Sequence, residues 1–255
     1  MTEIVFFETR FQILSGVYRS GAIIDRDDVC KEYGVSAKVV LDAFRLLLVE
    51  GYLDSPKRAI YAIRAWDEIQ LQDHFEMWAT LTSLAASRTA ERASMEEIEE
   101  CAMLLSDPDS FDFGLPNSVE EHIREFCLFN AELFRLSKAV PLLGLSQNFI
   151  PNALRRYGIY CSSAEQLKND RKLLSEITEL LYQRDSVGLR DEVAKLIMRP
   201  LVDVIQFVSS HQKESTSVVV NRFSADMKSK GCQFGLGGRE PSLDGTIYPY
   251  GYVAR

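Results

Sequence analysis

Apolar residues recur at helical spacing on both sides of the tripeptide Gly34-Val35-Ser36, near the start of this 255-residue chain. The apolar positions are Val29 and Tyr33 before the tripeptide, and Val40, Phe44 and Leu47 after it. This spacing predicts two short helices joined by a tight turn. Gly34 permits the left-handed backbone that ends the first helix, and Ser36 is expected to cap the second through its side chain. Such a pair of helices is a helix-turn-helix.

Two short apolar runs follow the second helix, which is expected to span Ala37 to Glu50 and to end at Gly51. The runs, Tyr52-Leu53 and Ala59 to Ile63, are separated by a turn that carries Lys57 and Arg58. Their position predicts a β-hairpin, or wing, beside the helix-turn-helix.

The residues ahead of the motif predict one helix and one extended segment. Ile4, Phe7, Phe11 and Leu14 repeat at three- or four-residue spacing, which predicts a helix over residues 2–15 that ends at Gly16. We expect Val17 to Ile24 to be extended and Asp25 to cap a short helix over residues 26–33.

From Trp66 onward the apolar pattern is typical of longer helices, and no turn-rich linker separates it from the wing. Capping-box patterns begin at Ser94 and at Ser118, and Pro200 is expected to kink the last helix. The pattern predicts an all-helical bundle of about six helices, over residues 66–92, 94–105, 118–137, 141–156, 163–184 and 186–211.

The helical pattern ends after His211, where glycine and proline become frequent. The expected fold class is therefore mostly α, with a winged helix-turn-helix domain over residues 1–65, a helical domain over 66–211 and a flexible tail over 212–255.

Composition and charge narrow the class of protein. No apolar run is long enough to cross a bilayer and no signal pattern opens the chain, so we expect a cytoplasmic protein without a membrane segment. The five cysteines include no C-x-x-C pair, which argues against a disulfide framework and a cysteine zinc site. The net charge is −8, whereas residues 1–64 hold nine basic and nine acidic residues, so the acidic surplus belongs to the remainder.

The chain resembles the GntR family of bacterial transcription regulators, in the branch whose C-terminal part is called the FCD domain. In the head the resemblance rests on Ile13-Leu14-Ser15-Gly16, Gly21, Tyr33-Gly34-Val35-Ser36, Ala43-Phe44-Arg45-Leu46-Leu47 and Glu50-Gly51-Tyr52-Leu53. In the body it rests on Glu76, Leu84-Ala85-Ala86, Phe129-Asn130 with Leu133, and Ile177 with Asp185. It covers roughly the first four-fifths of the chain, and it does not specify a member or a ligand.

The resemblance implies a DNA-binding head, from which this chain departs in part. Where the family reads Ser-Arg-Thr-Pro-Val-Arg-Glu-Ala, residues 36–43 place Ala37 and Leu41 at the two arginine positions, and Ala59 replaces the wing glycine. A solvated surface role is the alternative for each basic residue that remains. The candidate DNA-binding residues are Arg26, Ser36, Lys38, Arg45, Lys57 and Arg58.

The resemblance also implies a metal site of one Asp and three His in the body. Those positions fall on Phe126, Asn130, Leu174 and about Leu201, so we expect no metal and no other cofactor. Asn130 lies on the apolar stripe of its helix, where it is either a hydrogen-bonded core residue or a ligand contact. The candidate effector-binding residues are Asn130, Arg124 and Arg155, since arginine can pair with a carboxylate.

The leading hypothesis is a ligand-responsive repressor that binds a near-palindromic operator in double-stranded DNA as a homodimer, with a small organic effector for which an acid is favoured. The alternative is a non-catalytic binding or interaction module that has lost specific DNA recognition. No enzyme motif supports catalysis, and the pairs His122/Glu125 and His74/Glu76 are expected to lie on solvated helix faces. The sequence does not identify the effector, the operator or the regulated pathway.

Overall fold

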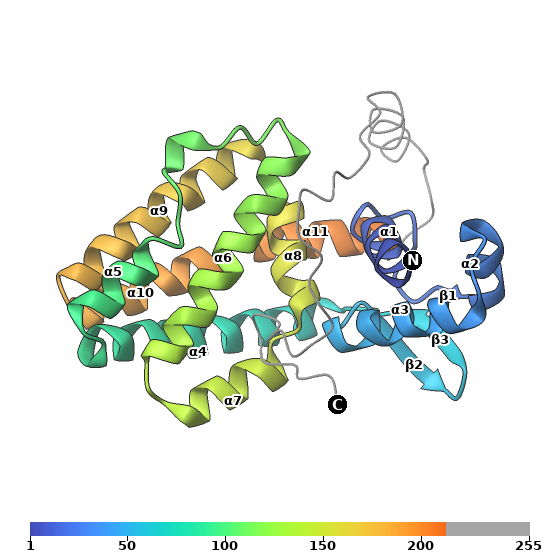
Figure 1. Cartoon of the computed structure of the whole chain (residues 1–255), viewed down its shortest axis with the longest axis horizontal. Coiled ribbons are helices and arrows are strands. Elements are labelled where there is room, and N and C mark those ends of the chain that lie inside the picture. Colours follow the sequence, from blue (N-terminus) through green and yellow to red (C-terminus); the bar gives the residue numbers. More distant parts are fainter. Residues whose placement is uncertain (213–255) are drawn as a thin grey trace. The chain divides into compact units, whose positions relative to one another are not determined.

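The computed structural model describes residues 1–212 of the chain (Figure 1). These residues form two compact units, one of residues 1–66 with the helix end 207–212, and one of residues 67–206. The fold is mostly helical with one small sheet, as the apolar pattern predicts. The predicted flexible tail lies outside the described residues, except for Gln212, which ends a helix.

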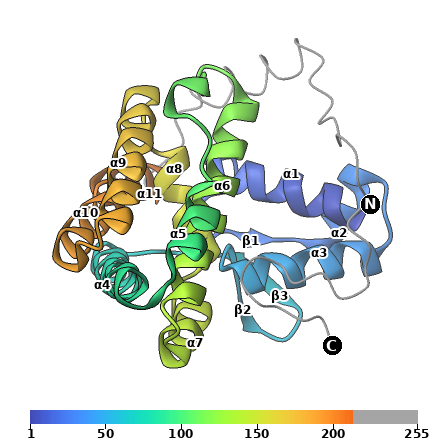
Figure 2. The ribbon, with the colours of Figure 1, turned by 60° about the vertical axis from the view of Figure 1, so that its left-hand side comes forward.

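The first unit is a winged helix-turn-helix. Its helices are α1 (Thr2–Leu14), α2 (Arg26–Tyr33) and α3 (Ala37–Glu50), and its strands are β1 (Ile23–Ile24), β2 (Leu53–Lys57) and β3 (Ile60–Ile63). The strands form an antiparallel sheet in the order β1-β3-β2. Figure 2 shows α1 beside α3, against which it packs. Val40, Phe44 and Leu47 on α3 are fully buried, which confirms the apolar stripe.

Backbone conformation confirms the predicted helix ends in this unit. Gly34 and Gly51 have φ angles of 63° and 86°, in the left-handed region that favours glycine. Asp25 caps α2 by accepting hydrogen bonds from the backbone N–H groups of Asp27 and Asp28. The predicted capping role of Ser36 is wrong, because its side chain makes no capping hydrogen bond.

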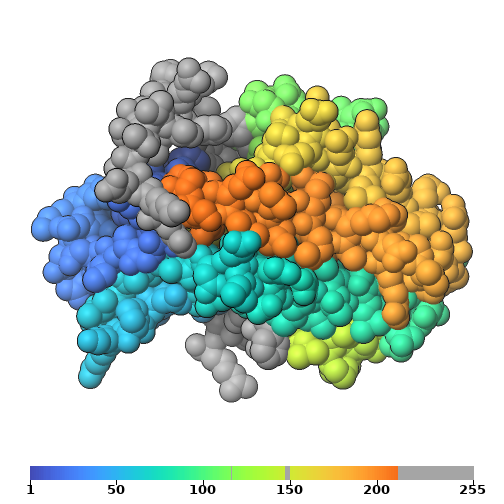
Figure 3. Space-filling view, turned by 180° about the vertical axis from the view of Figure 1, so that it is seen from behind, coloured from blue at the N-terminus to red at the C-terminus, as the bar shows by residue number. Residues whose placement is uncertain are grey.

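The second unit contains one bundle of helices built around α4. The elements of the remaining described chain are α4 (Glu68–Arg92), α5 (Met95–Ala102), the 3₁₀ turn η1 (Pro108–Ser110), α6 (Pro116–Leu136), α7 (Val140–Phe149), α8 (Asn152–Tyr160), α9 (Ala164–Tyr182), α10 (Ser186–Met198) and α11 (Leu201–Gln212). Helix α4 contacts α6, α7, α9 and α10. In Figure 3, α10 (orange) lies along α4 (teal). Within residues 1–212, every helix is too short or too polar to span a bilayer.

Proline accounts for three differences from the predicted helix bounds. Helix α6 begins at Pro116 rather than at the predicted capping box of Ser118, because proline fits the first helical turn. The helix predicted over residues 141–156 is divided at Pro151, whose predecessor is forced into an extended conformation. At Pro200 the last helix ends and α11 begins anew, where only a kink was predicted.

The segment predicted to be extended between α1 and α2 is mostly a turn. Only Ile23 and Ile24 form a strand. Gly16 and Gly21 have φ angles of 75° and 78°, which breaks the extended path that the apolar residues indicated.

Candidate functional site

The exposed face of α3 carries the basic residues of the predicted DNA-binding set. Lys38 and Arg45 lie two helical turns apart, on the face opposite the buried stripe. Ser36 is exposed at the first turn. Asp42 lies between the two basic residues and accepts a hydrogen bond from Nη1 of Arg45 at 2.5 Å. The face is therefore basic at both ends and acidic at its centre.

The wing presents two further cations at its tip. Lys57 ends β2 and Arg58 follows it, and both side chains are exposed. Ala59 completes the turn with a φ angle of 62°, the left-handed conformation that the family glycine would adopt without strain. The tip (cyan) protrudes from the surface of its unit in Figure 3, so its cations are accessible.

Arg26 is placed differently from the other basic residues. It lies on the first turn of α2 and pairs with Asp27 at 2.7 Å. The structure therefore brings Ser36, Lys38 and Arg45 onto one helix, and it adds a separate basic group on the wing.

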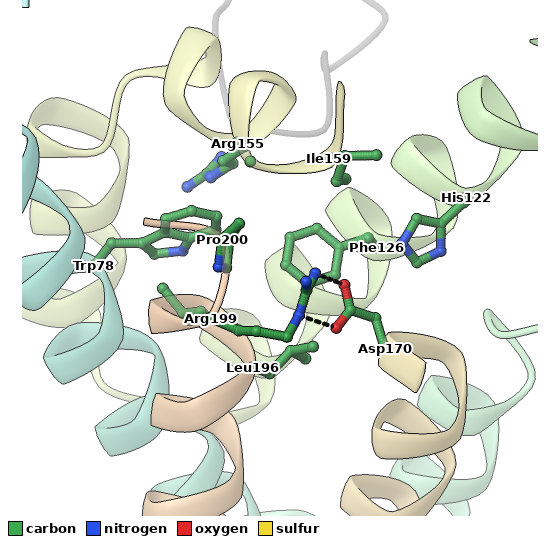
Figure 4. A pocket seen from close by; sticks show the side chains of 11 residues that line it. Trp78, His122, Phe126, Arg155, Ile159, Asp170, Leu196, Arg199 and Pro200 are labelled. Carbon is green, nitrogen blue, oxygen red and sulfur yellow. Dashed lines mark hydrogen bonds and ion pairs between the residues drawn. The ribbon is translucent and has the colours of Figure 1, made fainter. Parts of the chain in front are cut away.

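A small cavity in the helical unit is lined by polar and aromatic side chains from five helices (Figure 4). The space open to the centre of a water molecule is about 20 Å³, which holds about one water. The lining residues are Trp78, His122, Phe126, Arg155, Gly158, Ile159, Asp170, Leu196, Ile197, Arg199 and Pro200.

An ion pair between α9 and the end of α10 forms one wall of this cavity. Nε of Arg199 donates to Oδ1 of Asp170 at 2.6 Å, and Nη2 of Arg199 donates to Oδ2, so the pair is bidentate (Figure 4). Nη2 also donates to the hydroxyl of Ser162. Burial raises the pKa of Asp170 to about 6, although the Arg199 guanidinium acts in the opposite direction.

Some of the nitrogen atoms that line the cavity are buried without a hydrogen-bond partner in the described part of the structure. They include Nε1 of Trp78, Nδ1 of His122, a residue only 1% exposed, and Nη1 of Arg199. Burial and the positive charge of Arg171 lower the pKa of His122 to about 3, so its imidazole is neutral at physiological pH. Unsatisfied polar atoms inside a protein are costly, which makes them candidates for binding a ligand.

A second buried ion pair lies next to the cavity and fixes the segment before α6. Nη1 of Arg171 donates to Glu125 at 2.8 Å, and Glu125 accepts from the backbone N–H and the hydroxyl of Ser106. The Arg171 guanidinium lies 4.1 Å from the ring centroid of Phe111. The predicted solvated face for His122 and Glu125 is therefore wrong, because both residues are buried.

The three predicted effector-binding residues lie in different environments. Arg155 is 2% exposed, lines the cavity and lies 5.7 Å above the ring centroid of Trp78. Asn130 is buried but donates to the backbone oxygen of Phe126 at 2.7 Å, outside the cavity lining. Arg124 is exposed and pairs with Glu121. Only Arg155 is therefore placed to meet a molecule in the cavity.

Sequence reasoning missed His122, Asp170 and Arg199 as cavity residues. A signal existed for His122, which lies four residues before Phe126 on the buried stripe of α6. None existed for Asp170 and Arg199, because their proximity depends on how α9 packs against α10.

The side chains of the cavity do not fit a divalent metal ion. The described residues contain no group of three or more His, Cys, Asp or Glu side chains placed to hold one. Both oxygens of Asp170 already bind the Arg199 guanidinium, whose positive charge would repel a metal ion. Of the four positions where the family resemblance places metal ligands, only Phe126 lines the cavity.

Comparison with known proteins finds similarity at the level of structure. The chain matches no family model and no curated protein. Its structure aligns with "E. coli McbR/YncC" at a TM-score of 0.55 and 16% identity, over 81% of this chain and 97% of that one. It aligns over the same shares with the structure titled "Lar controls the expression of the Listeria monocytogenes agr system and mediates virulence", at a TM-score of 0.58 and 14% identity. The likeness is one of fold.

A third alignment reaches a GntR family member, a transcriptional regulator from Pseudomonas syringae pv. tomato, at a TM-score of 0.43 and 17% identity. It covers 82% of this chain and 88% of that one. The first two alignments carry the conclusion that this chain has the fold of a winged-helix head followed by a helical body.

Proposed function

We propose that the protein is a DNA-binding transcription regulator of the GntR type, without catalytic activity. The observation that carries the proposal is the winged helix whose exposed α3 face and wing tip both present cations. Those cations are Lys38, Arg45, Lys57 and Arg58. In helix-turn-helix proteins the second helix enters the major groove, while basic residues around it hold phosphates.

The first turn of α3 is the part expected to reach base edges. Ser36 and Lys38 lie there, and the hydroxyl of Ser36 is not used for capping. The other cations are expected to contact phosphates, so binding should weaken steeply as salt rises. Because DNA is the proposed partner, the proposed compartment is the cytoplasm.

We further propose that the regulator is a homodimeric repressor controlled by a small organic effector. A dimer of winged helices binds two half-sites, which explains a near-palindromic operator. The cavity with Arg155 and Arg199 supports effector binding in the helical unit. A ligand acts as a switch only if it binds one of two conformations more tightly than the other.

The second candidate is a non-catalytic interaction module that has lost specific DNA recognition. Ala37 and Leu41 at the family arginine positions favour it, as does the pairing of Arg45 with Asp42. The two candidate functions predict different effects on DNA affinity when the basic residues of α3 are removed.

A gel mobility shift with the double variant Lys38→Ala/Arg45→Ala separates the two functions. The probe is the promoter fragment beside the protein's own gene, across a salt series. We expect wild type to retard the fragment at low salt and the variant to lose at least about tenfold in affinity. The matched control is Lys168→Ala/Lys172→Ala, which removes two exposed charges from α9.

Equal retardation by wild type, variant and control would show that α3 does not contact DNA. Failure of wild type to retard any fragment at low salt would contradict the proposal and support the interaction module.

A further inference from the structure

We propose that Leu41 of α3, with Ala37 beside it, reads thymine in the major groove through contact with the C5-methyl group of that base. Each half-site of the bound DNA therefore carries thymine at the position that faces Leu41. The inference rests on the proposed DNA-binding function and adds to it the base that the helix selects. Both residues lie in the first two turns of α3.

These two residues form an apolar edge of the helix surface, which we call the Ala37–Leu41 edge. They are four positions apart, so their side chains lie one above the other on the same face. Both are half-buried, whereas Val40, Phe44 and Leu47 of the neighbouring stripe are fully buried. Part of each side chain of the edge is therefore open to a partner outside the unit.

Cations border this edge on the surface that is proposed to meet DNA. Lys38 precedes Leu41 by three residues and Arg45 follows it by four, so both are its neighbours on the helix surface. Both cations are exposed. If they hold phosphates or base edges as proposed, Leu41 enters the major groove between them. The place of Leu41 thus follows from the same docking that the proposed function requires.

The chemistry of the edge distinguishes thymine from the other three bases. Alanine and leucine side chains neither donate nor accept hydrogen bonds, so they cannot pair with the polar atoms that guanine, adenine and cytosine present. Thymine alone carries a methyl group in the major groove, and removing apolar surface from water is favourable. Against any other base the edge would cover polar atoms without giving them a partner, which is costly.

The same two residues are those that favour a protein without specific DNA recognition, because neither can bind guanine as arginine does. If the edge contacts thymine, the substitutions change the selected base from guanine to thymine, and specific recognition is retained. The two interpretations predict opposite results when thymine methyl groups are removed from the bound DNA.

Deoxyuridine in the DNA tests the contact, because this nucleoside differs from thymidine only in lacking the C5-methyl group. The full-length wild-type protein is titrated with the duplex that it enriches from a random-sequence pool. Further duplexes carry deoxyuridine in place of one thymine of each half-site, one position at a time. We expect at least one position at which affinity falls about fourfold for each methyl group removed. Fluorescence anisotropy measures the affinities.

Substitutions of Leu41 show whether this residue makes the contact. Leu41→Ala should bind the thymine duplex several-fold more weakly and should not respond to deoxyuridine at the contacted position, so the two changes are not additive. Leu41→Met keeps an apolar side chain of similar volume and should retain most of the response. The matched control is Val202→Ala, which shortens an exposed aliphatic residue of the helical unit and should respond as wild type does. Circular dichroism checks that each variant is folded.

The inference is overturned if no deoxyuridine substitution lowers the affinity, or if the enriched half-site contains no thymine. A response of Leu41→Ala as strong as that of wild type also overturns it. In each of these cases sequence-specific binding by the wild type leaves the proposed function standing. Wild-type protein that enriches no sequence at all refutes the proposed function together with the inference.

Discussion

Asp170 combines burial, a raised pKa and a bidentate arginine partner, and this combination predicts a pH dependence. Its pKa rises from 3.8 in the unfolded chain to about 6 in the folded one. The folded state therefore holds the proton more tightly, and the stability that protonated Asp170 contributes is fully present below pH 3.8 and lost as pH rises through about 6.

The measurement compares wild type with Asp170→Asn. As pH falls from about 7 to about 5.5, Asp170 takes up a proton in the folded state, so the free energy of unfolding of wild type should rise relative to that of the variant. Of the groups around it, His122 of α6 has a pKa of about 3, and hydrogen bonds from Ser106 and Arg171 hold the pKa of Glu125 below its ordinary value despite burial. Urea denaturation across this window measures both proteins, and a stability difference that stays the same at every pH would contradict the raised pKa of Asp170.

Ala59 occupies a left-handed conformation at the wing tip, and this strain predicts a stabilising substitution. Its φ angle is 62°, which costs an L-residue roughly 1 kcal/mol, so Ala59→Gly should raise the free energy of unfolding by up to about 1 kcal/mol. Gly34, with φ of 63° and open space around its Cα, is the matched control. Gly34→Ala should lower stability by about 1 kcal/mol. Urea denaturation measures the free energy of unfolding of both variants. A lower value for Ala59→Gly than for wild type would show that the backbone of Ala59 is not strained.

Asp42 lies between the two basic residues of α3, where it should weaken DNA binding. Its contact with Arg45 at 2.5 Å neutralises that cation, and its charge repels phosphate. Asp42→Ala should therefore increase the affinity for DNA about threefold. It should also make the slope of log affinity against log salt concentration more negative by about one. Fluorescence anisotropy with a labelled duplex measures this, with Asp191→Ala on α10 as control. Weaker binding by Asp42→Ala would show that the acid is part of recognition.

Among the elements of the first unit, the residue Gly16, which follows α1, lies beside His211 near the end of α11. A Cβ atom on Gly16 would lie 2.1 Å from the His211 ring, and the φ angle of Gly16 is 75°. Gly16→Ala should therefore lower the stability of the winged helix by roughly 1–3 kcal/mol. The double variant Gly16→Ala/His211→Ala should recover part of that loss, as thermal denaturation would show. Purely additive effects would mean that the clash is absent.

Helix boundaries show which elements could be predicted from sequence. Local signals include the glycines that end α2 and α3 and the capping box that begins at Ser94. The structure confirms all of them. The errors occurred where two local signals competed. At the start of α6 the proline overrode the capping pattern of Ser118, and at Pro151 the preceding residue left the helical region. Apolar periodicity continued across both prolines and hid the breaks.

The cavity could be predicted only in part, because it depends on tertiary packing. Arg155 was identified from its chemistry, whereas Asp170 and Arg199 come from helices whose register no sequence pattern reveals. The DNA-binding set was easier, since all its members lie on one helix-turn-helix and wing, and their exposure follows from helical periodicity. Its role in DNA binding stays a prediction.

At the scale of the whole molecule, a winged helix is joined along the chain to a helical unit with a charged cavity. In the proposed function, the first unit binds DNA and the second senses a ligand. The first unit is proposed to recognise a specific DNA sequence.

Selection of bound duplexes from a random-sequence pool would show whether the winged helix has this specificity. Wild type should enrich a near-palindromic site with half-sites about one helical turn apart, and footprinting should show protection of both halves. Lys38→Ala/Arg45→Ala should enrich none, while Lys168→Ala/Lys172→Ala should behave as wild type. If wild-type protein enriches no sequence at low salt, the winged helix does not recognise a specific DNA sequence and the proposed function is contradicted.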